Sequence, residues 1–210
     1  MKGPGAARLP AAVLGSGPTT AVFLHQTDGN GLCGWWPYAV WLTSHYKVRA
    51  VLLDLCNYNS KAVCPNQTFA DDQRAQVAVG MRFARGLSAS RIVLVGASMG
   101  GALALASATE NRASAVVDLS GPDGWANAEA SVSTPKLTVP LLMAASPADD
   151  NVVYSKLQKA FQLDPAKPKL FLNPPGSAHG YELLDGPSGN GWSPLASQVA
   201  RWITGDYKTS

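Results

Sequence analysis

The amino-acid sequence predicts a single α/β domain over residues 1–210, built on a mostly parallel β-sheet that helices cover on both faces. Short apolar runs rich in β-branched residues alternate with longer helical patterns, which is typical of βα units on a parallel sheet. Most of these runs are apolar almost throughout, as strands are when both faces are buried. The chain is 46% hydrophobic and 15% charged, which suits one compact domain with a sizeable core.

The predicted elements follow one another without an internal repeat or a low-complexity linker. The expected strands are Ala21–His25, Val48–Leu53, Arg91–Val95, Ala115–Leu119, Pro140–Ala145 and Lys169–Leu172. The expected helices are Phe69–Gly86, Ser98–Asn111, Asn151–Phe161 and Ser193–Ile203. Residues Ser120–Pro140 are mostly small and polar, so we expect a loop there, too short to form a lid domain.

The charge balance and the hydropathy exclude several classes of protein. A net charge of +3 comes from scattered basic residues, which argues against nucleic acid or a membrane surface as a partner. The sequence has no apolar run of the roughly 20 residues that a transmembrane helix needs. Its opening segment lacks the apolar core of a signal peptide. We therefore expect a soluble protein, cytoplasmic or secreted after removal of a leader, and the sequence is compatible with a monomer.

The three cysteines, Cys33, Cys56 and Cys64, do not have the spacing of a zinc site. Cys56 and Cys64 bracket a short loop, so a local disulfide is one interpretation. Closing so short a loop would contribute on the order of 2–3 kcal/mol in the chain-entropy model. Free thiols in a reducing compartment are the alternative, and the sequence leaves both open.

A serine between two glycines, Gly96-x-Ser98-x-Gly100, lies between a predicted strand and a predicted helix. A sharp turn of this kind raises a serine hydroxyl above the end of the sheet and needs glycines around its crowded backbone. The pattern is weak by itself, and an ordinary turn in which Ser98 caps the helix is the alternative. We interpret Ser98 as a nucleophile because a base and an acid follow at suitable places.

A serine nucleophile needs a general base and a group that orients the base. When these follow the serine in the order acid, then histidine, His179 is the only histidine available. Asp149 directly follows a buried strand and is the expected acid. Asp150, which we expect to lie at the start of the next helix, and Asp123, after the preceding strand, are the alternatives.

The polar turn that follows the first predicted strand allows two interpretations. A turn at this place can donate a backbone N–H to a developing oxyanion. The turn also contains Gly29-x-Gly31-x-x-Gly34, followed about 20 residues later by Asp54, which matches a dinucleotide-binding fingerprint. In that fingerprint the glycines directly follow the strand and the last one opens a helix. Here three residues intervene, and two tryptophans and a proline come next, so we favour the first interpretation.

With these motifs in place, the chain resembles the α/β-hydrolase superfamily along nearly its whole length, and within it small esterases of the dienelactone-hydrolase-like and carboxylesterase groups. The matching segments are LHQTDGNG before a Trp-rich helix, VLLDL, GASMGG, ADDNVV and GSAHG. The resemblance implies a catalytic triad of Ser98, Asp149 and His179. It also implies that the backbone amides of Thr27 and Met99 bind the oxyanion.

Two departures from the family pattern affect these expectations. The family commonly has His-Gly at the oxyanion turn, whereas this sequence has His25-Gln26, so Gln26 is an alternative oxyanion donor. We expect His25 to shape the turn rather than to react. Dienelactone hydrolases use a cysteine nucleophile, so Ser98 argues against that particular activity.

The expected reaction is hydrolysis of a short or medium acyl ester, in a small molecule or an exposed polymer, with neither metal nor cofactor. The side chains expected to line the open site are Trp35 or Trp36, Met99, Trp125 and Tyr181, and either of the first two could instead belong to the core. The alternatives are other acyl chemistry on the same triad, namely a thioesterase, perhydrolase or acyltransferase. An NAD-type oxidoreductase and a catalytically silent binding module are more distant alternatives.

Overall fold

A computed structural model describes residues 1–2, 8–56 and 62–207, so residues 3–7 of the opening segment and 57–61 of the loop after Cys56 lie outside the described residues. Within this part of the chain, a seven-stranded sheet has the order β1-β3-β2-β4-β5-β8-β9. Strand β1 pairs with β3 in antiparallel fashion, and the other pairs are parallel. The strands are β1 Ala11–Gly15, β2 Thr19–Leu24, β3 Val48–Leu53, β4 Arg91–Ala97, β5 Ala115–Leu119, β8 Leu141–Ala144 and β9 Lys169–Leu172.

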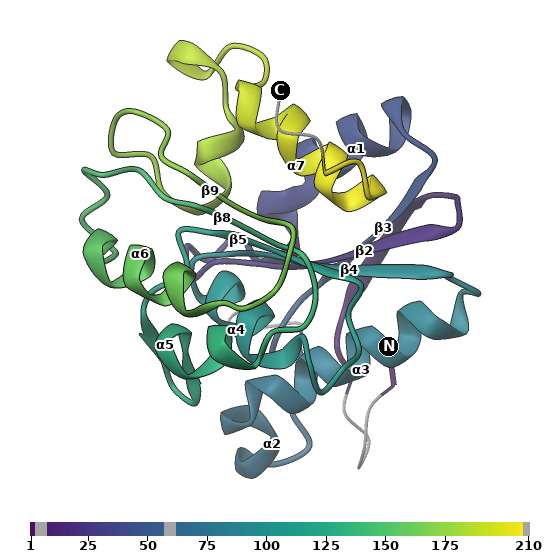
Figure 1. The fold of residues 1–210 in the computed structure, drawn as a ribbon. Coiled ribbons are helices and arrows are strands. Elements are labelled where there is room, and N and C mark those ends of the chain that lie inside the picture. Colours follow the sequence, from purple (N-terminus) through teal and green to yellow (C-terminus); the bar gives the residue numbers. More distant parts are fainter. Residues whose placement is uncertain (3–7, 57–61, 208–210) are drawn as a thin grey trace.

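Helices cover both faces of this sheet (Figure 1). One face carries α1 (Trp36–His45) and α7 (Pro194–Thr204). The other face carries α2 Gln67–Asp71, α3 Gln73–Gly86, α4 Met99–Ser107, α5 Ala130–Ser133 and α6 Tyr154–Leu163. In the described part of the chain, no helix combines the length and the apolar character that crossing a bilayer requires.

The core consists of two apolar layers, one on each face of the sheet. Side chains alternate along each strand, so Val22 and Leu24 of β2 face the layer under α3 and α4, whereas Ala21 and Phe23 face the layer under α1 and α7. All four are fully buried. This two-sided burial explains why the strands are apolar almost throughout.

The predicted α/β fold class is confirmed, and each predicted strand lies within about two residues of an observed one. The first strand, β1, was not predicted, since an edge strand that is only half buried lacks a strong apolar pattern. The expected helix Phe69–Gly86 is wrong in one respect. It consists of α2 and α3, which are separated at Asp72, and the Asp72 carboxylate caps α3 by accepting a hydrogen bond from the Ala75 amide.

The segment between β5 and β8 contains no long helix. It forms a two-stranded hairpin of β6 (Gly124–Trp125) and β7 (Ala128–Glu129), followed by α5 and a single 3₁₀ turn. The hairpin packs against α4 at one end of the sheet. The expected loop is therefore partly ordered secondary structure.

The disulfide question, which the sequence leaves open, is resolved by the structure. Cys56 and Cys64 are bonded to each other, and Cys33 is an exposed free thiol. The bond joins the end of β3 to the segment that leads into α2.

Candidate active site

The candidate site lies where the strand order reverses. From β2 the chain continues to β3 on one side and later to β4 on the other, and Leu24 of β2 pairs with Gly96 of β4. In open α/β sheets such a switch point leaves a crevice at the carboxyl ends of the strands. The turn after β2 and the turn that carries Ser98 therefore meet at the same edge of the sheet.

Ser98 occupies a sharp turn between β4 and α4. Its backbone has φ 51° and ψ −122°, a strained conformation for a residue with a side chain. A Cβ on Gly96 would overlap the carbonyl group of Gly100, and a Cβ on Gly100 would overlap the carbonyl oxygen of Leu24. The two glycines are thus required by close backbone approach, which explains the Gly-x-Ser-x-Gly pattern. The Ser98 amide donates to Leu119 O at 2.8 Å, which anchors the turn to β5.

Met99 follows Ser98 and is the first residue of α4, so its N–H has no acceptor within the helix. Its side chain is fully buried in the core, so the expectation that this side chain lines an open site is wrong. A backbone donor beside Ser98, at the positive end of a helix, can stabilise negative charge on a bound oxygen.

His179 and Asp149 form a hydrogen-bonded pair. His179 Nδ1 lies 2.7 Å from Asp149 Oδ2, and the carboxylate also accepts from the Asn151 amide at 3.0 Å through Oδ1. Burial raises the pKa of Asp149, but its polar neighbours, of which His179 and Asn151 have the largest effects, together lower it by more, so the pKa lies below its ordinary value. An ionised Asp149 can only accept, so Nδ1 of His179 carries the proton and Nε2 is left as an acceptor.

The other two candidate acids are placed elsewhere. Asp123 forms an ion pair with Lys156 at 2.8 Å. Asp150 is exposed, and the expectation that it begins the next helix is wrong, because α6 begins at Tyr154 and is preceded by the turn that contains Asp149. Among the three carboxylates, Asp149 is the one that contacts His179.

The loop that carries His179 packs directly on the other two turns. A Cβ on Gly180 would overlap Oε1 of Gln26 and would lie 3.3 Å from Cβ of Ala97, the residue before Ser98. Gln26 Oε1 accepts a hydrogen bond from the Tyr181 amide at 3.3 Å. The buried Gln26 side chain therefore links the turn after β2 to the His179 loop, whereas Thr27 beside it is exposed.

The aromatic residues expected to line the site differ in their burial and in their contacts. Trp35 is fully buried, donates to Leu24 O at 2.9 Å and packs on Phe23, so the core alternative holds and it cannot wall an open site. Trp36 begins α1 and is 46% exposed. The Tyr181 ring packs edge-on against Trp35 and fills the space that a side chain on Gly34 would occupy.

Trp125 is held by a residue that the sequence did not single out. Its indole N–H donates to Gln73 Oε1 at 2.7 Å, and Gln73 Nε2 lies 3.7 Å from the Met99 sulfur. Gln73 is buried in the first turn of α3. A glutamine at a helix start carries no signal of this role in the sequence, because its partners are 26 and 52 residues away along the chain.

The dinucleotide pattern has a different structural role. The segment from Gly31 to Trp35 is a 3₁₀ turn, not the start of an α-helix, and Asp54 accepts a hydrogen bond from the Leu32 amide at 2.6 Å. The glycines and Asp54 therefore stabilise the turn after β2 itself. Within the described residues, no three His, Cys, Asp or Glu side chains are grouped so that they could hold a metal ion.

The chain is similar in fold to solved structures. No protein-family model matches it, and no curated protein matches its sequence significantly. A dienelactone hydrolase from Anabaena variabilis has a TM-score of 0.72 and 17% identity, with 94% of this chain and 91% of that chain covered. Est1E from Butyrivibrio proteoclasticus, solved with ferulic acid, has a TM-score of 0.71 and 14% identity, with 95% and 94% covered.

A monoacylglycerol lipase from Paleococcus ferrophilus is a third similar structure, with a TM-score of 0.70 and 13% identity over 95% of this chain and 99% of that chain. These similarities extend over nearly the whole chain, as the sequence resemblance implies. The chain has the α/β-hydrolase fold, and its structural neighbours are hydrolases and esterases.

Proposed function

We propose that this protein is a serine esterase that hydrolyses esters with short to medium acyl chains. The observation that carries the proposal is the strained Ser98 turn at the same edge of the sheet as the hydrogen-bonded pair of His179 and Asp149. A strained serine between a strand and a helix has no evident structural benefit, whereas it is the geometry that a nucleophile needs. The esterase and hydrolase names of the structural neighbours agree with it.

In the first half of the reaction, the Ser98 oxygen attacks the ester carbonyl while His179 takes the hydroxyl proton at Nε2. Asp149 keeps the other ring nitrogen protonated and stabilises the imidazolium that forms. His179 then gives its proton to the leaving alcohol. The carbonyl–oxygen bond breaks, and an acyl group remains on Ser98.

The tetrahedral intermediate carries a negative oxygen that needs hydrogen-bond donors. The backbone amides of Met99, at the start of α4, and Thr27, in the turn after β2, supply them in the proposed mechanism. In the second half, His179 takes a proton from water while the water oxygen attacks the acyl carbonyl. The bond to the Ser98 oxygen then breaks, His179 gives its proton to that oxygen, and the acid is released.

The surroundings of Ser98 support the proposed substrate class. The segment between β5 and β8 carries a short hairpin and no helix long enough to close over the site. An open site with an aromatic wall at Trp125 can hold a small acyl group, in a free ester or at the surface of a polymer. We expect no activation at a lipid interface.

Labelling with a fluorophosphonate probe and hydrolysis of p-nitrophenyl acetate test the proposal together. Wild-type protein should be labelled at Ser98, and Ser98→Ala should lose both labelling and roughly 10⁴–10⁶ in kcat. Ser44→Ala, in the exposed C-terminal turn of α1, is the matched control and should retain both. Folded wild-type protein that is neither labelled nor active would refute the proposal, and faster turnover of matched thioesters would reassign the acyl chemistry.

A further inference from the structure

The turn after β2 contains the peptide bond between Gln26 and Thr27. The Thr27 N–H, the proposed oxyanion donor, belongs to the same peptide unit as the Gln26 carbonyl. This peptide bond is trans. In a trans peptide the N–H and the C=O point in opposite directions. Whatever holds the Gln26 carbonyl therefore sets the direction of the Thr27 N–H.

The side chain of His25 holds that carbonyl. His25 Nδ1 lies 2.8 Å from the Gln26 carbonyl oxygen, and Nε2 accepts a hydrogen bond from the Leu55 amide at 3.1 Å. Because Leu55 N–H is a donor, Nε2 must be unprotonated, and the single ring proton is on Nδ1. His25 therefore donates to the Gln26 carbonyl, in one tautomer selected by the backbone.

The protein environment favours this neutral form. The His25 side chain is fully buried. Burial lowers the pKa of His25 below its ordinary value, in spite of the raising effects of the Gln26 carbonyl and of the nearby Asp54 and Asp28 carboxylates. The ring thus remains a donor to Gln26 and an acceptor from Leu55 at neutral pH.

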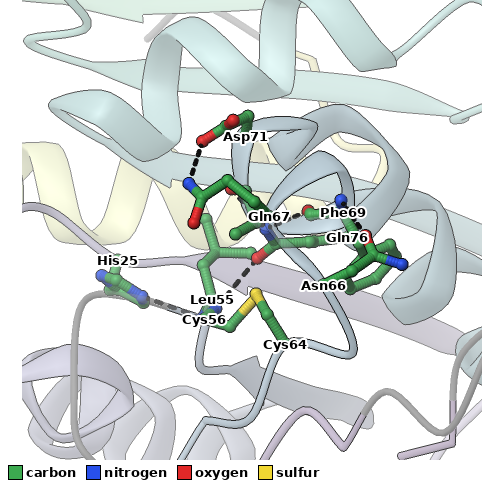
Figure 2. The surroundings of a disulfide bond; sticks show 10 residues. His25, Leu55, Cys56, Cys64, Asn66, Gln67, Phe69, Asp71 and Gln76 are labelled. Atoms are coloured by element: carbon green, nitrogen blue, oxygen red, sulfur yellow. Dashed lines mark hydrogen bonds between the residues drawn. A yellow bond between two sulfur atoms is a disulfide. The ribbon is translucent and has the colours of Figure 1, made fainter.

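The Leu55 amide is itself fixed by its neighbour Cys56. Cys56 is disulfide-bonded to Cys64, and its amide donates to Gln76 Oε1 at 2.9 Å. Figure 2 shows His25 reaching the backbone at Leu55, with the disulfide and Gln76 on the other side of that backbone. The buried Gln76 side chain donates in turn to the Phe69 carbonyl of α2 at 3.0 Å.

We propose that His25 is a positioning residue that aims the Thr27 N–H at the oxyanion, with the disulfide-bonded end of β3 as its anchor. The role rests on the proposed esterase function and concerns the tetrahedral intermediate and the transition states on either side of it, since the bound ester itself carries no oxyanion. Loss of His25 should therefore lower kcat and leave KM nearly unchanged. A merely structural role would reduce the fraction of folded enzyme without changing kcat per active site.

The test compares His25→Leu with His25→Asn, whose amide can still donate to the Gln26 carbonyl. His45→Leu, at the exposed end of α1, is the matched control. With active sites counted by fluorophosphonate titration, His25→Leu should lose roughly 100-fold in kcat toward p-nitrophenyl acetate. His25→Asn should recover part of this loss.

Inhibition by a trifluoromethyl ketone is a second measurement, and a merely structural role of His25 would leave it unchanged. Ser98 adds to the ketone carbonyl and leaves an oxyanion, so His25→Leu should weaken this inhibition by about the same factor as kcat falls. An unchanged kcat per active site, or unchanged inhibition, overturns the inference. If wild-type protein itself lacks esterase activity, the proposed function fails instead.

One measurement does not depend on any variant folding. Nitrogen-15 NMR of wild-type protein reports the tautomer of each histidine ring, and His25 should be protonated at Nδ1 and unprotonated at Nε2 at neutral pH. A proton on Nε2 would overturn the inference, because the ring could then neither accept from Leu55 nor be held in this orientation.

Discussion

Oδ2 of Asp149 lies 2.7 Å from Nδ1 of His179, although the two residues are 30 positions apart and follow different strands, β8 and β9. These strands are parallel neighbours, with Ala144 opposite Leu172, so their carboxyl ends lie side by side. The loop after β9 then extends across the end of the sheet to Ala97, beside Ser98. Strand order thus brings Asp149 and His179 to the same edge of the sheet as Ser98.

The first prediction separates the three candidate acids. Asp149→Asn should lower kcat for p-nitrophenyl acetate by about 10⁴, because the amide can no longer hold the required imidazole tautomer. Asp150→Asn and Asp123→Asn should each change kcat less than about threefold, since Asp150 is exposed and Asp123 pairs with Lys156. A large loss in either of these variants, with Asp149→Asn active, would reassign the acid.

The second prediction concerns Trp125 as a residue that lines the binding site for the acyl group. Trp125→Ala should raise the ratio of kcat/KM for p-nitrophenyl octanoate over acetate by roughly tenfold, because removing the indole opens space beside Met99. Gln73→Leu should shift the ratio in the same direction but less, since it removes the hydrogen bond that holds the indole. An unchanged ratio in both variants would exclude Trp125 from the site.

Trp36→Ala is the comparison for the other candidate wall residue, at the start of α1. A shift in the same ratio would assign Trp36 to the pocket.

A tributyrin emulsion extends the test of the open site. The rate for wild-type protein should show no jump above the solubility limit, and a sharp rise there would contradict a lidless site.

The third prediction is a pH dependence of stability that arises from Asp118. Burial raises the pKa of this carboxyl to about 7, although the Gly121 amide donates to it at 2.7 Å. The folded state therefore holds a proton that the unfolded chain releases near pH 4. The contribution of Asp118 to stability is complete below the unfolded pKa and is lost as the pH rises through about 7.

Asp118→Asn keeps the acceptor for Gly121 but cannot ionise. At pH 8 the variant should be more stable than wild type by about 2 kcal/mol, which corresponds to roughly 4–8 °C in Tm, and the difference should shrink toward pH 5. Asp150→Asn, which removes an exposed charge, is the control in the same thermal melts. An equal difference in stability between the variant and wild type at both pH values would contradict the assignment of the pH dependence to Asp118.

The fourth prediction concerns the disulfide. Cys64→Ser should lower the free energy of unfolding in urea by about 2–3 kcal/mol, because the reduced chain regains loop entropy when unfolded. Cys33→Ser, at an exposed free cysteine, should leave it unchanged. If the disulfide anchors the Leu55 amide that binds His25, as inferred above, Cys64→Ser should also lower kcat by a few fold. An unchanged free energy of unfolding in Cys64→Ser would show that the disulfide does not form.

Several features could be predicted from the sequence because their cause is local. The apolar runs follow from burial on both faces of a sheet, and the pattern around Ser98 follows from backbone crowding within five residues. The Asp149 turn was located correctly, but the start of α6 was not, since the turn continues to Val153. An edge strand such as β1 carries too little burial to leave a pattern.

The sequence by itself determined the α/β class, the strand positions and the residue types of the candidate site, because periodicity and glycine placement are properties of neighbouring residues. Tertiary structure alone decided that Trp35 belongs to the core, that Asp149 contacts His179 and that Gln73 holds Trp125. It also decided that Cys56 is oxidised in a bond to Cys64. These outcomes depend on distances between segments far apart in the chain, which are set by strand order and by packing, and no local pattern encodes them.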